Sequence, residues 1–182
     1  MNIPMISLLT IEMEGRERQS SGNDRASALL DVGHRPLLLV DADPVGGVVQ
    51  AVGLAPNRTL ADVRRDVLKT ARGADENHRQ SLADTLDYRV LEALGEHDDL
   101  AVLAMGRALD PGCYCPVHTL LRHAIETLWA PYPAVLVDAE AGVEQIQREL
   151  TRRLDRVLVV VDGSQRSLRT LDVIRELLGD TP

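Results

Sequence analysis

Aromatic residues are scarce in this chain of 182 residues, which has no phenylalanine, one tryptophan and three tyrosines. It therefore has too few flat side chains to form a surface on which nucleic acid bases stack. Acidic residues outnumber basic ones by 28 to 20, and the resulting net charge of -8 repels phosphate backbones and anionic lipid surfaces. We expect neither nucleic acid nor a membrane as a partner.

Long hydrophobic runs and a cysteine framework are also missing. The first apolar run, at 3–11, is too short to span a bilayer and has no basic flank, so we interpret it as a buried strand. Two cysteines cannot form a disulfide framework, which is typical of a reducing compartment. These features predict a cytoplasmic protein.

Aliphatic residues are abundant, and 45% of the chain is hydrophobic. Further apolar runs occur at 35–44, 99–106, 134–143 and 155–164, and helical patterns lie between them at 59–71, 81–94, 116–128, 143–153 and 165–178. Continuous rather than alternating hydrophobicity favours strands that are covered on both faces. The sequence therefore predicts one α/β domain, 1–182, with a doubly wound, mostly parallel sheet and helices on both faces.

The first candidate motif is "VDADP" at 40–44, which places Asp41 and Asp43 at the end of a predicted strand. A carboxylate at that position can meet Mg²⁺ or a water that attacks a phosphate. Aspartate is also common where it caps a following helix. Both interpretations remain open from these residues alone.

The second candidate motif is "VLVDAEAG" at 135–142, which has the form of a Walker B strand. Asp138 ends the apolar run, and Gly142 follows in a turn of small residues that can bring a backbone amide toward a γ-phosphate. The alternative is again a loop with a helix cap.

The third motif, "GCYCPVH" at 112–118, contains both cysteines of the chain. Cys113 and Cys115 supply two of the four ligands that a tetrahedral metal site needs, so His118, another residue or a second chain must complete it. The simplest metal site pairs both cysteines across a two-fold homodimer, and Ni²⁺ or Zn²⁺ suits such thiolates. Alternatively, the cysteines are small apolar fillers. We interpret His118 as lying on a polar flank.

Five segments together carry a resemblance to a known family: 40–44, 60–63, 103–122, 135–144 and 159–170. They resemble the carbon monoxide dehydrogenase accessory ATPases that help insert nickel. That family is part of the deviant-Walker class with the nitrogenase iron protein and the MinD and ParA ATPases. The resemblance covers 36–178 and implies a fold like that of P-loop NTPases, with 1–35 as a degenerate first strand, loop and helix.

The resemblance also implies roles for single residues. Asp43 would act on the attacking water, Asp41 would lie near Mg²⁺, Asp138 would be the Walker B acid and Gly142 the switch glycine. The two cysteines would bind the metal at a dimer interface. The implied cofactors are ATP with Mg²⁺ and a nickel or zinc ion, and the implied client is a nickel metalloenzyme such as carbon monoxide dehydrogenase.

The chain departs from this family at the phosphate-binding loop, which aligns with "EGRERQSS" at 14–21. Gly15 and Ser20 match a loop glycine and the Mg²⁺-binding hydroxyl, and Ser21 follows in the same cofactor-binding segment. Glu14 and Gln19, however, replace the two lysines that contact phosphate in the family. Without lysine and glycine amides, placing a phosphate there costs on the order of several kcal/mol of electrostatic stabilisation.

The only lysine of the chain, Lys69, lies within a helical pattern, so no Walker A lysine exists. Family members also continue beyond 178 to another strand, so we expect a sheet that is incomplete at its C-terminal edge. The predicted function is a nickel-enzyme maturation factor of the ATPase type, although the missing lysines argue against hydrolysis. The alternatives are a non-hydrolytic metal-binding or partner-binding module, such as a decayed copy, and a partition or positioning ATPase.

Overall fold

The computed structural model describes residues 5–10, 16–71, 85–107, 115–139, 155–161 and 164–178. Six strands in these ranges form one sheet with the order β3-β4-β2-β5-β1-β6, in which only the β3–β4 pair is antiparallel. The strands are β1 Met5–Thr10, β2 Leu37–Ala42, β3 Leu94–His97, β4 Leu100–Ala104, β5 Ala134–Ala139 and β6 Arg156–Val160. The predicted doubly wound, mostly parallel sheet is confirmed.

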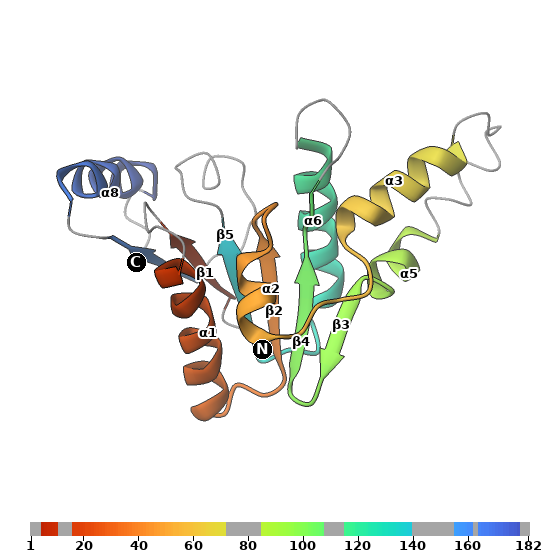
Figure 1. Cartoon of the computed structure of the whole chain (residues 1–182), viewed down its shortest axis with the longest axis horizontal. Coiled ribbons are helices and arrows are strands. Elements are labelled where there is room, and N and C mark those ends of the chain that lie inside the picture. The colour runs from red at the N-terminus through yellow and green to blue at the C-terminus, as the bar shows by residue number, and fades with distance from the viewer. Residues whose placement is uncertain are drawn as a thin grey trace.

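Helices cover both faces of this sheet (Figure 1). They are α1 Arg16–Asp31, α2 Gly47–Val52, α3 Leu60–Ala71, α5 Leu86–Leu91, α6 Cys115–Leu128 and α8 Gln165–Leu178. One buried cluster joins the sheet to α3 and α6, and a second joins it to α1 and α2. The two clusters are the two sides of the core.

The strand β2 is apolar at consecutive positions because helices cover it on both faces. Leu38 and Val40 belong to the cluster with α3 and α6, whereas Leu37 and Leu39 belong to the cluster with α1 and α2. All six residues of β2 are buried, as are all six of β5. Because both faces are covered, both strands are apolar up to the aspartate near their carboxyl ends, Asp41 in β2 and Asp138 in β5.

The predicted helix over 81–94 is wrong at its C-terminal end. The described part of this segment contains the short helix α5, Leu86–Leu91, and then β3, which forms a hairpin with β4. Pairing with the open edge of β4 outweighs local helix propensity here, because a helix could not satisfy that edge. The predicted helix over 143–153 lies outside the described residues.

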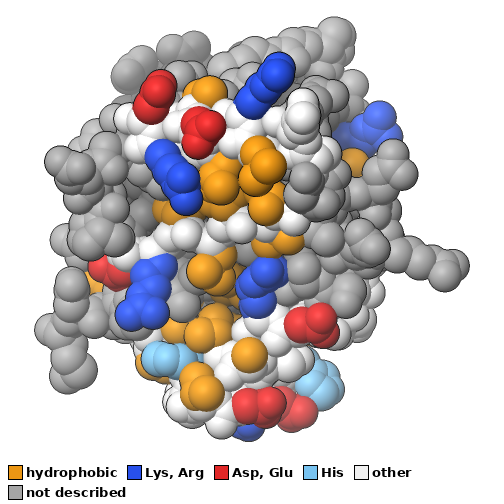
Figure 2. Space-filling model, turned by 90° about the vertical axis from the view of Figure 1, so that its left-hand side faces the viewer, with side chains coloured by type: hydrophobic (Ala, Val, Ile, Leu, Met, Phe, Trp, Pro, Cys, Tyr) orange, Lys and Arg blue, Asp and Glu red, His pale blue; other side chains and the backbone are white. Residues whose placement is uncertain are grey.

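The opposite edge of the sheet is formed by β6 and is more exposed than its centre. Leu158 of β6 is 40% exposed, and Leu168 and Val173 of α8 are 48% and 44% exposed. Figure 2 shows hydrophobic side chains on this side of the molecule with basic and acidic side chains around them. None of the helices in the described ranges is long and apolar enough to cross a membrane.

Candidate functional site

The strands β2, β4 and β5 are parallel neighbours, so their carboxyl ends meet at one edge of the sheet. Asp41 is the register partner of Asp138 on β5 and of Ala104 on β4. Adjacent strands lie about 4.8 Å apart, and Asp43 follows only two residues after Asp41. Three of the predicted site carboxylates therefore share this edge, and Asp41, Asp43 and Asp138 are 0%, 4% and 1% exposed.

Asp41 is held by backbone amides on both carboxylate oxygens. Its Oδ1 accepts the N–H of Asp43 and its Oδ2 accepts the N–H of Val49, each at 3.1 Å. Because Val49 lies in the first turn of α2, Asp41 caps that helix from the sheet, as the capping alternative predicts. Burial raises the pKa of Asp41 above its usual value of 3.8; the hydrogen bonds oppose this, and the nearby Asp43 adds to it.

Asp43 organises the turn that leads from β2 into α2. Its Oδ1 accepts the N–H of Val45 at 2.8 Å, and its carbonyl accepts the N–H of Gly46 at 3.1 Å. Gly46 has a φ of 75°, a conformation that glycine adopts without strain. The turn thus directs the chain away from the sheet directly after the two aspartates.

Carboxylate oxygens are hard donors of the kind that Mg²⁺ prefers, and Mg²⁺ is commonly held by one or two carboxylates with water and phosphate oxygens. Among the described residues, no three His, Cys, Asp or Glu side chains converge to form a metal cage. The donor chemistry of this edge therefore fits a Mg²⁺ ion that brings most of its other ligands with it, and does not fit a metal enclosed by the protein.

The segment that aligns with the phosphate loop is largely helical, because α1 begins at Arg16. Ser20 and Ser21 therefore lie inside α1, where backbone amides are bonded to the carbonyls of the preceding turn and cannot cradle a phosphate. Gly15 lies outside the described residues. Lys69 is exposed in the last turn of α3, roughly 14 Å along the helix axis from Leu60.

The helix predicted after the cysteines is confirmed as α6, which begins at Cys115. Cys113 lies outside the described residues, and so does Gly142 of the Walker B motif. The placement of His118 on a polar flank is wrong, because His118 is only 8% exposed. It lies three residues before Leu121, which is fully buried, so the two share one face of the helix.

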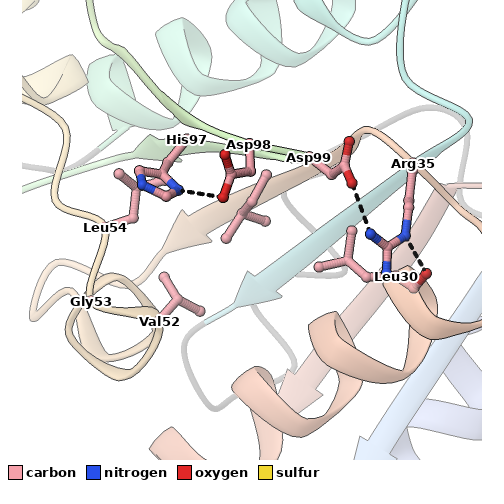
Figure 3. A pocket seen from close by; sticks show the side chains of 9 residues that line it. Leu30, Arg35, Val52, Gly53, Leu54, His97, Asp98 and Asp99 are labelled. Carbon is pink, nitrogen blue, oxygen red and sulfur yellow. Dashed lines mark hydrogen bonds and ion pairs between the residues drawn. The ribbon is translucent and has the colours of Figure 1, made fainter.

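A cavity of 360 Å³ lies at the other end of the strands from the three aspartates, next to the amino ends of β2 and β4. Its polar rim is already paired within the protein (Figure 3): Arg35 contacts Asp99 at 2.8 Å, and His97 contacts Asp98 at 3.2 Å. None of the predicted site residues lines it. The cavity is thus separate from the carboxylate edge.

Sequence reasoning missed the groups that support Asp41 from the side of β4. The N–H of Met105 donates to the Asp41 carbonyl at 2.8 Å, and the Met105 carbonyl accepts the N–H of Ala61 at 2.9 Å. The available signal was Thr59-x-x-Asp62, a capping box at the start of α3. It marks where α3 begins and therefore where the helix meets the sheet edge.

Comparison with known proteins finds relatives of matching sequence. No established family model matches the chain. It is 33% identical over 144 residues to an uncharacterized ATP-binding protein of Methanocaldococcus jannaschii, covering 79% of this chain and 57% of that protein. It is 30% identical over 167 residues to the carbon monoxide dehydrogenase accessory protein CooC of Rhodospirillum rubrum, covering 85% of this chain and 62% of CooC. The chain therefore spans less than two thirds of either relative.

Solved structures show the same fold at lower identity. The MinC:MinD cell division protein complex of Aquifex aeolicus matches with a TM-score of 0.59 and 21% identity, covering 96% of this chain and 63% of that one. A ParA family ATPase of Chlorobium tepidum matches with a TM-score of 0.60 and 19% identity, covering 99% and 70%. Both similarities concern the doubly wound α/β architecture.

Proposed function

The chain belongs to the CooC/MinD/ParA-like family of ATPases, and from this membership we propose that it is a maturation factor for a nickel enzyme of the carbon monoxide dehydrogenase type. In this proposal it holds a metal ion through Cys113 and Cys115, which are shared across a homodimer. The client is a nickel metalloenzyme that receives the ion. The nickel and dimer components are inferred from the similarity to CooC and from the cysteine pair.

The observation that carries this proposal is the place of Cys115 in the fold. The helix α6 connects the parallel strands β4 and β5, so it starts at the same sheet edge where the three carboxylates lie. Cys115 is its first residue, and the helix dipole stabilises a thiolate at that position. Thiolates bind soft and borderline metal ions, including Ni²⁺ and Zn²⁺.

Two cysteines per chain favour a metal shared between two chains. A two-fold axis would bring four sulfurs together without any further ligand type, and each chain alone could supply only half of that set. The expected stoichiometry is therefore one metal ion per two chains. A site completed within one chain would instead bind one ion per chain.

The site that the family uses for ATP is only partly supported by the residues of this chain. ATP with Mg²⁺ would, when bound, supply a γ-phosphate for attack by water. Asp43 is the residue that would hold that water, and Asp138 would fix the metal side, as both are buried at the carboxylate edge. The lysines that balance phosphate charge are missing, so a second candidate function is metal or partner binding without hydrolysis.

The metal proposal is tested by measuring bound Zn²⁺ and molecular mass for the reduced full chain. We expect one Zn²⁺ per dimer for the unchanged protein and none for the variant with Cys113→Ser and Cys115→Ser. A matched control is Thr119→Ser, an exposed change on the same helix that removes no sulfur. Unchanged metal content and dimer mass in the double variant would contradict the proposal of a metal site shared between two chains.

The two candidate functions are separated by nucleotide. A ligand that binds only the folded state raises stability by about 2.7 kcal/mol at a hundredfold excess over its Kd, which is readily seen as a rise in Tm. We expect no rise with ATP and Mg²⁺ and no phosphate release, as the non-hydrolytic candidate requires. A rise in Tm accompanied by phosphate release would instead establish an active ATPase.

A further inference from the structure

The cavity at the amino ends of β2 and β4 has no part in the proposed metal or nucleotide site. Three segments that are far apart in the sequence line it: the end of α1 with Arg35, the end of α2 at 52–54, and the turn between β3 and β4 at 97–100. Its volume of 360 Å³ lies at the lower end of the range of about 300–1,000 Å³ that is usual for small-molecule sites. The cavity is therefore large enough to hold a small organic molecule.

The floor of this cavity is apolar and continuous with the core. The four side chains that form it pack against the buried cluster that joins the sheet to α1 and α2, and each stays partly exposed: Leu30, Val52, Leu54 and Leu100. An apolar group placed on this floor removes the remaining exposed surface of these side chains from water, which favours its binding.

The polar rim of the cavity contains two carboxylates and one guanidinium. The Arg35 side chain contacts Asp99 Oδ2 at 2.8 Å and donates from Nε to the Leu30 carbonyl at 2.8 Å, so it balances Asp99 and is also engaged with α1. His97 balances the charge of Asp98 only when its ring is protonated. With a neutral imidazole, no described side chain of the rim balances Asp98, whose side chain is 87% exposed and open to a ligand.

Two helix ends add to the negative potential of the cavity. Leu30 lies in the last turn of α1, and Val52 is the last residue of α2. The final carbonyl groups of a helix lack partners within the helix and favour a positive charge nearby. Neither helix has a basic residue in its last turn. The backbone and the side chains therefore favour the same charge on a ligand.

The turn that carries the two aspartates is held in place by the rest of the fold. The pairing of His97 with Leu100 leaves only Asp98 and Asp99 between β3 and β4. The Asp99 carbonyl accepts the N–H of Leu37 at 2.8 Å, and Asp98 has a φ of 51°, which aspartate tolerates in tight turns. Aspartate is common in such turns, so the turn alone indicates no ligand. Its position across the cavity from the apolar floor does (Figure 3).

We propose that this cavity binds a small organic cation. Its amine or guanidinium group lies at Asp98, and its apolar body lies on the floor formed by the leucine and valine side chains. The proposal uses neither the cysteine pair nor the carboxylate edge, so it stands or falls independently of the proposed function. Because an ion pair at an exposed rim is weak and the apolar floor is small, we expect affinities in the millimolar range for simple probes.

The test is a titration of the isotopically labelled full chain with phenethylamine at about pH 8, where imidazoles are neutral and the amine is charged. Binding is followed by the chemical shifts of the backbone amides. Phenethyl alcohol keeps the apolar body without the charge, and methylamine keeps the charge without the body. We expect saturable shifts at Gly53, Asp98 and Leu100 with phenethylamine, about fivefold weaker binding of phenethyl alcohol, and no saturation with methylamine.

A matched pair of variants tests the role of Asp98. Asp98→Asn removes the charge and keeps the shape of the side chain, and asparagine also tolerates a positive φ. The control Asp172→Asn removes the same charge from a side chain on α8 that is 75% exposed and does not line the cavity. We expect Asp98→Asn to weaken phenethylamine binding about fivefold and to leave phenethyl alcohol binding unchanged, whereas Asp172→Asn should change neither.

Two kinds of result would overturn the proposal. Shifts with phenethylamine that do not saturate, or that lie away from the lining residues, would show that the cavity is not a binding site. Equal affinities for phenethylamine and phenethyl alcohol would show that it does not select a cation. Equal affinities of Asp98→Asn and Asp172→Asn for phenethylamine would do the same.

Discussion

Replacing Asp41 by asparagine should change how stability depends on pH. Asp41 is fully buried, and burial raises its pKa above the ordinary 3.8. The stability that a raised carboxyl contributes is complete below pH 3.8 and is lost as the pH rises through the folded-state pKa. Asparagine stays neutral, so the variant gains on the unchanged protein as the pH rises, by at most about 1.4 kcal/mol per pH unit.

A second, pH-independent effect opposes this gain. Both oxygens of Asp41 accept a backbone N–H at 3.1 Å, from Asp43 and Val49. Asparagine has only one carbonyl oxygen, so one of these buried amides loses its acceptor at a cost of about 1–3 kcal/mol. The variant should therefore be the less stable protein in acid, and the difference should narrow or reverse toward neutral pH.

The assay is urea unfolding at several pH values from about 4, just above the ordinary pKa of 3.8, to 8, followed by the fluorescence of Trp129. Trp129 is the only tryptophan and packs against the core cluster. The control is Asp172→Asn, because the Asp172 side chain is 75% exposed and is not desolvated. If the free energies of unfolding of Asp41→Asn and the unchanged protein run parallel across this range, desolvation of Asp41 is refuted.

Three further predictions concern stability and use the same unfolding assay. Thr59→Ala removes the cap of α3 and should cost about 1 kcal/mol, whereas Thr59→Ser should cost much less; equal losses would contradict the capping role. Leu121→Ala opens a cavity under a fully buried side chain and should cost about 2–5 kcal/mol, and a loss below this range would mean that the site collapses around the gap. His123→Ala breaks a 2.7 Å contact with Asp87 between side chains that are 42% and 61% exposed, so it should cost less than about 1 kcal/mol, and a larger loss would contradict a weak surface contact.

The central part of the sheet could be predicted from sequence because burial on both faces leaves a simple signal. The strand at 37–42 has no polar residue before Asp41, and no amphipathic helix has that pattern. The strand at 94–97 could not be found in the same way. Its residues Leu94, Gly95, Glu96 and His97 are paired only because β4 offers an open edge, and that edge is not encoded near them.

The residues of the candidate site also differ in whether a sequence pattern reveals their position. Asp41, Asp43 and Asp138 could be placed together because parallel strands bring their carboxyl ends to one edge. Gly106 lies so close to Thr59 that an added Cβ would be 2.3 Å from Thr59 Oγ1, and because the two residues are far apart in the chain no local pattern reveals this approach. The burial of His118 could have been predicted from its position three residues before Leu121, because residues at that spacing share one face of a helix. The polar character of the side chain instead favoured a polar flank.

The position of β1 in the sheet has a consequence for the order in which the protein can fold. Met5 pairs with Val135, and Ile6 pairs with Arg156, so β1 is inserted between two strands that lie 130 and 150 residues further along the chain. The unit of β2, β4 and β5 can form beforehand, but β1 must wait with its backbone groups unpaired. The pairs that β1 makes with β5 and β6 are therefore the most distant in sequence among the paired strands described here, and we expect them to form after the central unit.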